Sequence, residues 1–186
     1  MLKRMLWSAI PLAVALTALV ANADAAPQRK ILIKDNCDPT TFDQALGPGA
    51  CVGQGAVTFQ QFTNELQRLQ RAPQWHFVPD RVHLTVDEPF TATNVGGEDH
   101  TFTEVDAFGG GFVPQLNQLA GNLTPRPECA QTINGQLSPA PSAQASLRHP
   151  GQSLTDSEEE PGTHLYQCCI HPWMHAVLTV REKGGQ

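Results

Sequence analysis

The sequence predicts an all-β sandwich with one short helix and a long loop insertion. Apolar and polar residues alternate with a period of two over several short segments, and turn-forming residues separate these segments. Several short strands divided in this way indicate a sandwich, and no internal repeat is visible. The segments expected to form strands are 30–33, 75–79, 81–86, 90–95, 100–105, 145–149, 164–168 and 176–180.

The first residues have the pattern of a cleaved targeting signal, which we expect at 1–23. Two basic residues precede an apolar stretch, and small residues then offer a cleavage site after Ala23, with Ala25 as the alternative. A membrane anchor is the competing interpretation, but the apolar run is short and contains Pro11. We therefore expect an exported protein, periplasmic or secreted, with no membrane span once the signal is removed.

Removal of this signal shifts the formal net charge from −6 to −8, because it takes away one lysine and one arginine. An acidic chain argues against nucleic acid as a partner, since phosphates need a basic face. An acidic surface can instead attract a basic partner protein, although most charged surfaces only keep proteins soluble. Cutting after Ala23 would leave 163 of the 186 residues, which suits one domain with a sizeable core and a monomer.

We expect residues 24–74 to form an N-terminal extension, in which 34–56 is a loop and about 59–71 is a helix. A capping-box pattern begins at Thr58, apolar residues follow at helical spacing, and Pro73 would stop the helix. The apolar residues at helical spacing are Phe59, Phe62, Leu66 and Leu69. We interpret this apolar face as cover for one end of the sandwich, and a partner-docking helix is the alternative.

The chain contains five cysteines, an odd number. Export permits disulfides, so four cysteines can pair in one of three connectivities while one serves as a metal thiolate. Cys37 and Cys51 enclose a loop with proline and glycine and make the natural first pair, worth about 3 kcal/mol in the chain-entropy model. By elimination Cys129 and Cys169 make the second pair, and a free, buried Cys129 is the alternative.

The main domain is expected at 75–186, and residues 107–150 interrupt its alternating pattern. This stretch is rich in glycine, proline, glutamine and asparagine and shows little periodicity. Loops of this length in compact domains are usually functional or disordered. The run Gly109–Gly111 lies just beyond the expected strand that carries His100. It forms either a lid beside that residue or an irregular wrap held by Cys129.

The run 166–174, Tyr-Gln-Cys-Cys-Ile-His-Pro-Trp-Met, carries the most specific chemistry of the chain. It places a thiolate, an imidazole and a thioether three residues apart, at Cys168, His171 and Met174, with a proline inside the turn. A trigonal site of two histidines and one cysteine with a weak axial methionine is the coordination that selects copper for electron transfer. His100 is the candidate for the second imidazole.

Only one of the two adjacent cysteines can face a metal, because neighbouring side chains of a strand point to opposite faces. Cys168 has the favourable loop spacing, whereas Cys169 leaves a single residue before His171. The remaining histidines are interpreted as incidental to any metal site. They are His76, His83, His149, His164 and His175.

The segments around His100 and 166–174 resemble the cupredoxins, the blue copper family that includes plastocyanin, azurin, amicyanin and pseudoazurin. In that family one histidine ligand follows a strand carrying asparagine. The other ligands lie on a loop before the last strand, introduced by an aromatic residue, one further residue and then cysteine. The resemblance covers roughly 75–106 and 160–181 and implies a cupredoxin-like Greek-key β-sandwich with a short, amicyanin-like ligand loop. By motif, it implies Tyr166 as a core aromatic residue and, as ligands of one copper ion, His100, Cys168, His171 and Met174.

In function, the resemblance implies an exported type 1 copper protein that carries single electrons by cycling between Cu(I) and Cu(II), and not an enzyme. Its partners would be redox proteins, which the sequence does not name. The ring edge of His171, on an exposed loop, would be the electron port. Pro172 and Trp173 would form an apolar rim beside it, with ordinary packing of Trp173 as the alternative.

Copper storage, sensing or delivery on the same fold is the alternative function. A fragment of a multicopper oxidase or nitrite reductase would need further histidine clusters such as His-x-His pairs, and the sequence contains none. Zinc is disfavoured because methionine is a poor zinc ligand.

Overall fold

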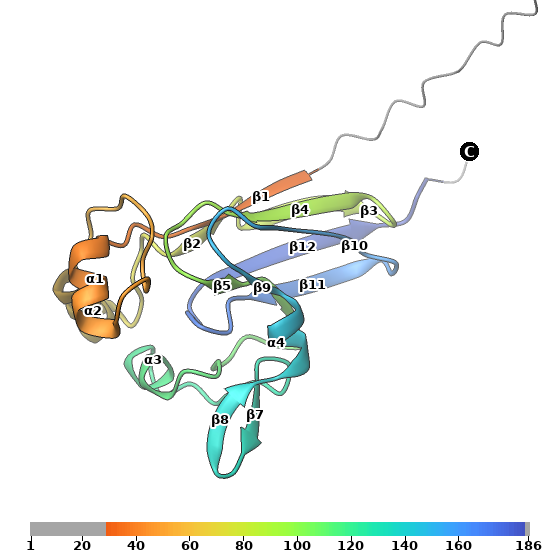
Figure 1. Cartoon of the computed structure of the whole chain (residues 1–186). Helices are drawn as coiled ribbons and strands as arrows, with labels where there is room; N and C mark the ends of the chain where they lie inside the picture. Colours follow the sequence, from red (N-terminus) through yellow and green to blue (C-terminus); the bar gives the residue numbers. More distant parts are fainter. Residues whose placement is uncertain (1–28, 185–186) are drawn as a thin grey trace, which may run out of the picture.

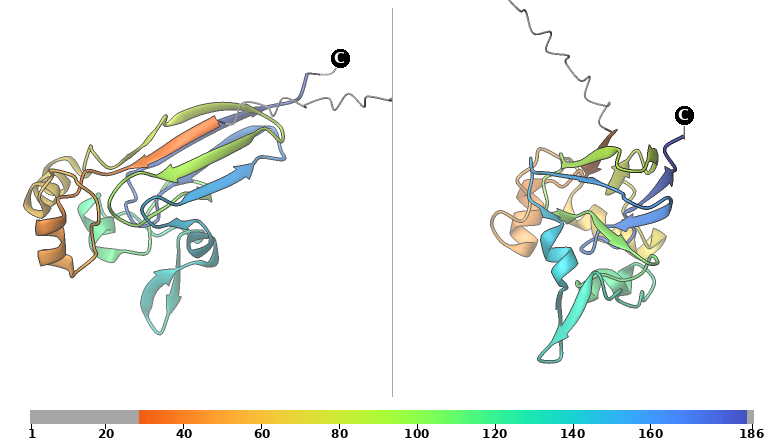
Figure 2. Two further views of the ribbon diagram at one scale, coloured as in Figure 1. Left: turned by 45° about the horizontal axis from the view of Figure 1, so that its top comes forward. Right: turned by 90° about the vertical axis from the view of Figure 1, so that its right-hand side faces the viewer.

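A computed structural model describes residues 29–184, so the expected signal segment 1–23 lies outside the described residues. Two four-stranded sheets pack against each other (Figures 1 and 2). The first sheet contains, in order, β10 (Ser153–Ser157), β4 (Pro89–Asn94), β1 (Arg29–Lys34) and β2 (His76–Val78). The second contains β3 (Arg81–Thr85), β12 (His175–Arg181), β11 (Gly162–Gln167) and β6 (Thr103–Val105).

The strand order shows that the chain crosses repeatedly between the two sheets. β1 runs parallel to β4 and β12 runs parallel to β3, whereas the other neighbours in these sheets are antiparallel. Parallel neighbours cannot be joined by a hairpin, so the connections must pass through the other sheet or around it. The predicted all-β sandwich is confirmed. β1 belongs to it, between β4 and β2, so the sandwich begins before residue 75.

The core follows from the alternation along the strands. β4 and β12 bury every second side chain, as the period-two pattern predicts. Aromatic rings fill the space between the sheets: Phe102 stacks on Tyr166 at 4.5 Å, and Phe90 meets Tyr166 edge-on at 5.7 Å. Burial of such a side chain contributes about 1.5–3 kcal/mol. Tyr166 is thus a core aromatic residue, as the resemblance implies.

Residues 36–74 form a helical cap at one end of the sandwich (Figure 1). Its second helix, α2 (Phe59–Leu69), confirms the predicted helix and its capping box. The expectation of a loop over 34–56 is wrong, because α1 (Pro39–Leu46) lies there. Asp38 accepts a hydrogen bond from the Thr41 N–H and Pro39 fills the first turn, which is a recognisable helix start.

The disulfide Cys37–Cys51 closes the cap, as predicted. Inside the cap, Phe42 of α1 packs on Phe62 of α2 at 5.5 Å and on Trp75 at 5.9 Å. The apolar face of α2 covers one end of the sandwich through Phe62 and Leu66, whereas Leu69, which we expected on that face, is 52% exposed.

The expected strand 100–105 is broken at Phe102. β5 (His100–Thr101) leaves the second sheet and pairs with the short strand β9 (Leu147–Arg148), while β6 pairs with β11. Phe102 is buried between the sheets. Because of this break, residues 100–101 pair with β9, whereas residues 103–105 pair with β11.

The expectation of little regular structure over 107–150 is wrong. This segment contains α3 (Pro114–Leu119), α4 (Pro141–Ala145) and a hairpin that projects from the body (Figure 1). The hairpin joins β7 (Ala130–Ile133) and β8 (Gln136–Pro139) through Asn134-Gly135, both with positive φ. Asn-Gly between short strands is a strong hairpin signal. Among the described helices, none is long and apolar enough to cross a membrane.

Candidate metal centre

The four residues predicted as ligands come from two segments far apart in the sequence. His100 begins β5, Cys168 directly follows β11, and His171 and Met174 lie in the turn before β12. Two backbone hydrogen bonds close this turn: the Cys168 N–H donates to the Met174 carbonyl at 3.1 Å, and the Met174 N–H donates to the His171 carbonyl at 3.0 Å. The turn is therefore a compact loop with a defined shape.

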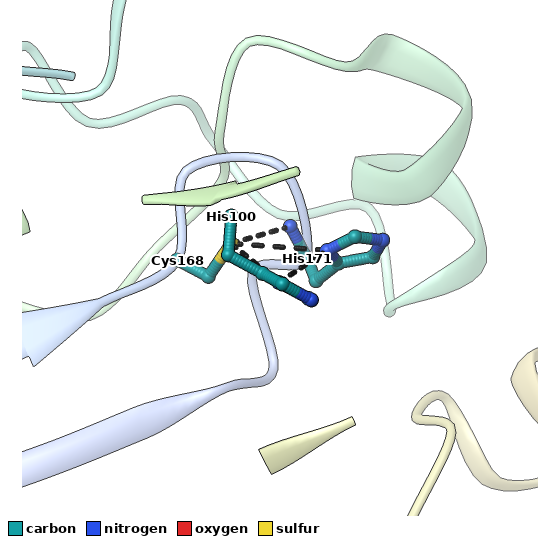
Figure 3. Close-up of side chains that lie close together, drawn as sticks. All are labelled: His100, Cys168 and His171. Carbon is teal, nitrogen blue, oxygen red and sulfur yellow. Dashed lines mark hydrogen bonds between the residues drawn. The ribbon is translucent and has the colours of Figure 1, made fainter. Parts of the chain in front are cut away.

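Three donor atoms converge at the end of the sandwich (Figure 3). The Cys168 Sγ lies 3.7 Å from the Nδ1 of His100 and 3.8 Å from the Nδ1 of His171, and the two Nδ1 atoms are 3.2 Å apart. The centre of the circle through these three atoms lies about 2.1 Å from each, close to ordinary metal–imidazole and metal–thiolate distances of about 2.0–2.3 Å. The triangle has the size that a single metal ion requires.

This triangle is shielded from water. Cys168 and His100 have no exposed surface and His171 is 2% exposed. Met174, the predicted axial ligand, is also buried and belongs to the same apolar cluster as Cys168. One thiolate and two imidazoles form a donor set suited to copper, and the backbone of Met174 closes the loop that carries two of them.

The surroundings of Cys168 favour its thiolate form. Its Sγ accepts backbone N–H groups of Thr101 and His171, both at 3.4 Å. Burial by itself raises the pKa of Cys168, but the contacts with the two imidazoles outweigh it and bring the pKa well below the ordinary value. A thiolate is the form that binds metals.

His100 is oriented by a residue that the sequence analysis did not single out, Asp35. The His100 Nε2 lies 2.9 Å from the Asp35 Oδ2, so the Nδ1 on the other side of the ring faces Cys168. Burial lowers the pKa of His100, yet the hydrogen bonds to Asp35 and Cys168 more than offset this and raise it to about 10. Asp35 directly follows β1, and only the tertiary pairing of β1 with β4 reveals its role.

His171 is not the exposed ring that we expected, because only 2% of its surface is exposed, while its role as an electron port stays a prediction. The helical cap covers it: the ring lies 6.4 Å from that of Phe62 and 5.5 Å from that of Trp173. Trp173 also packs on Phe62 at 6.0 Å, so its role includes packing. The apolar face of α2 explains the burial of the His171 ring, because Phe62 on that face packs against His171 and Trp173.

The cysteine assignments agree with the sequence analysis. Among the described residues Cys168 is the free cysteine, and it is buried. Cys129 and Cys169 form the second disulfide, so the alternative of a free Cys129 is wrong. Cys169 points away from the triangle, as alternation along a strand predicts.

The glycine run 109–111 lies against the strand that leads to Cys168. The Gln167 side chain pairs with the Gly109 backbone, and the Phe112 N–H donates to the Cys169 carbonyl at 3.0 Å. A Cβ on Gly111 would lie 1.8 Å from that carbonyl oxygen, so only glycine permits this approach. The run is therefore not a free lid. The Cys129–Cys169 disulfide holds the segment, as the alternative expected, and the run supports the backbone of the ligand loop.

A second group of metal-type side chains lies at the sheet edge, formed by Glu104, Glu158 and His164. The His164 Nδ1 is 2.7 Å from Glu104, and its Nε2 is 3.0 Å from the Glu160 carbonyl. Both ring nitrogens thus already have partners within the protein. We interpret this group as an ion-pair cluster.

No protein-family model matches the sequence, and no curated protein matches it. Among solved structures, a purple cupredoxin from Nitrosopumilus maritimus aligns over 83% of this chain and 100% of its own, with 16% identity and a TM-score of 0.41. Oxidised plastocyanin from Dryopteris crassirhizoma aligns over 82% and 99%, with 16% identity and a TM-score of 0.37. In fold, the chain resembles the cupredoxins.

A copper-containing nitrite reductase from Thermus scotoductus aligns over 59% of this chain and 21% of its own, with 16% identity and a TM-score of 0.35. All three likenesses concern the fold alone. The case for a metal therefore rests on the donor atoms of this chain.

Proposed function

We propose that this chain is an exported type 1 copper protein that carries single electrons. In this proposal His100, Cys168, His171 and Met174 would hold one copper ion. The observation that carries it is the buried triangle of one sulfur and two Nδ1 atoms, whose common centre lies about 2.1 Å from each atom.

When bound, copper would supply the one-electron couple between Cu(I) and Cu(II). The protein holds the donor atoms in place: two N–H groups fix the Cys168 sulfur, and Asp35 fixes the His100 ring. The hydrogen-bonded turn 168–174 limits movement of the remaining ligands. Ligands that keep their positions in both oxidation states keep the reorganisation on electron transfer small.

The enclosure of the triangle supports a carrier over an enzyme. A catalytic metal site keeps an open position for water or substrate. Here the three donor side chains are at most 2% exposed, and the cap lies over His171. The two disulfides support the exported location, since such bonds persist in oxidising compartments. Redox proteins would be the partners.

The decisive test is copper loading of the purified protein, followed by absorption spectroscopy and voltammetry. We expect intense sulfur-to-copper charge transfer and a reversible one-electron wave. C168S should abolish the absorption, whereas H83Q, a change at an exposed histidine of β3, should leave it intact. A folded protein whose Cu(II) form is colourless would overturn the proposal. Copper that passes readily to a chelator, without reversible cycling, would favour storage or delivery instead.

A further inference from the structure

Each of the two imidazoles of the triangle has a buried carboxylate on its far side. The His100 Nε2 lies 2.9 Å from Asp35, and the His171 Nε2 lies 3.6 Å from the Glu98 Oε2. The first contact is a hydrogen bond, and the second is an electrostatic contact at longer range. The Asp35 and Glu98 side chains are only 1% and 10% exposed.

Asp35 is fixed by a set of backbone donors. Its carboxylate accepts the N–H groups of Gly97 and Glu98, both at 3.0 Å, and of Cys37 at 3.2 Å. With His100 these donors surround both oxygens. A Cβ on Gly96 would lie 2.0 Å from the Asp35 Oδ2, so the loop closes tightly over the carboxylate. Asp35 therefore joins the end of β1 to the loop that precedes His100.

Glu98 is fixed from two sides. The Trp75 indole N–H donates to its Oε2, and the Asn94 side-chain amide donates to its carbonyl at 2.8 Å. The cap reaches the same loop, because the Val52 N–H donates to the Gly97 carbonyl at 2.8 Å. Hydrogen bonds thus link the segment closed by Cys37–Cys51 to the loop 96–98, and this loop holds both carboxylates next to the imidazoles.

Two consequences follow from general chemistry. A carboxylate that accepts the Nε2–H of a metal-binding histidine fixes the ring and the tautomer that presents Nδ1. A buried negative charge also favours the ion with the higher positive charge, because water does not screen it. Cu(II) exceeds Cu(I) by one charge.

Resting on the copper function proposed above, we propose that Asp35 is a positioning residue for His100, and that the carboxylates of Asp35 and Glu98 bias the centre toward Cu(II). The reduction potential of the wild type is then lower than that of a variant lacking either charge. Asp35 has the stronger effect, since its contact is shorter and its side chain is less exposed.

The test uses the full copper-loaded chain with the isosteric changes D35N and E98Q. We expect each to shift the ratio of Cu(II) to Cu(I) affinity about tenfold toward Cu(I), which raises the potential by about 59 mV for one electron. E159Q, which removes an exposed carboxylate, is the matched control and should leave the potential unchanged. W75F, which removes the donor that holds Glu98, should give a smaller shift in the same direction.

Two further measurements distinguish a positioning role of Asp35 from a purely structural role. In the diamagnetic Cu(I) form, nitrogen NMR should show a slowly exchanging proton on the His100 Nε2 in the wild type and its loss in D35A. The thermal stability of the metal-free variants reports any purely structural role. Should D35N not fold, the reduction potentials of E98Q and W75F test the inference instead.

The outcomes distinguish this inference from the proposed function. A blue wild type whose E98Q and D35N variants keep the wild-type potential would overturn the inference and leave the copper function standing. A wild type without sulfur-to-copper charge transfer would overturn the copper function itself.

Discussion

The ligand loop 168–174 and the helical cap 36–74 meet at the same end of the sandwich, yet they contribute in different ways. The loop supplies donor atoms from a short sequence, and two backbone hydrogen bonds close it. The cap supplies no donor atom but buries His171 through Phe62 and docks on the loop that carries Glu98. The comparison teaches that a local motif sets which atoms form the donor triangle, whereas a distant segment sets the exposure of His171.

The strongest test of this division is F62A, which removes the ring that links α2 to Trp75 and His171. We expect a loss of about 3–5 kcal/mol in the free energy of unfolding, as for other buried phenylalanines. Copper should remain bound, because no donor atom changes, while electron exchange with a small soluble oxidant should become faster. Denaturant titration and stopped-flow absorption measure the two effects.

The matched control for F62A is Q60A, on the exposed face of the same helix. It should change neither the stability by more than about 0.5 kcal/mol nor the exchange rate. Loss of copper from F62A under conditions where it is folded would show that the cap helps to hold the metal.

Removal of the cap disulfide should have a slightly smaller effect. The double change C37A/C51A opens a cross-link that spans 14 residues, which costs about 3 kcal/mol in the chain-entropy model. The cap should then open locally, and amide hydrogen exchange of α2 should rise more than that of β11 and β12. Equal acceleration of amide hydrogen exchange in α2, β11 and β12 would show that the cap does not open independently of the sandwich.

G111A tests the loop side of the comparison. A Cβ there would lie 1.8 Å from the Cys169 carbonyl oxygen, so the backbone beside Cys168 must move. Such overpacking costs about 1–3 kcal/mol, and here it should also shift the sulfur-to-copper absorption while the cap stays intact. G135A, in the β7–β8 turn with no atom within 4 Å of the added Cβ, is the control for a glycine replaced away from the ligand loop and should leave the absorption unchanged. An unaltered spectrum in folded G111A would show that the glycine run does not support the ligand loop.

The features that could be predicted from the sequence are those that depend on neighbouring residues. Alternation placed the main strands, the Thr58 capping box placed α2, and the spacing of Cys168, His171 and Met174 marked the loop that now lies beside His100. The sequence also contained two signals that were missed, Asp38-Pro39 before α1 and Asn134-Gly135 between β7 and β8.

The burial of His171 and the roles of Asp35 and Glu98 could not be predicted. They depend on contacts between residues more than 60 positions apart, such as the hydrogen bond between Asp35 and His100. Periodicity and short motifs carry no information about such pairs. The expectation of an exposed ring came from the resemblance, and the cap of this chain changes that feature.

The smallest predicted effect concerns His164 on β11, which lies outside both regions. Burial lowers its pKa, but the Glu104 carboxylate, the Glu160 carbonyl and the Glu158 charge more than compensate and raise it. A pKa raised on folding means that the protonated ring stabilises the protein. This contribution is complete below the unfolded pKa of about 6.5 and is lost as the pH rises through the folded value.

H164Q should therefore lower the free energy of unfolding at about pH 5.5 by about 0.2–1 kcal/mol, the range for partly exposed ion pairs, and by less at about pH 9. H83Q is the control, since His83 is exposed on β3. Denaturant titrations across this pH range measure the difference. Because no ligand contact changes, the copper absorption should be the same in both variants. A constant difference between H164Q and the wild type at all pH values would show that the loss reflects packing of the ring, and the sheet edge would then contribute no charge effect at all.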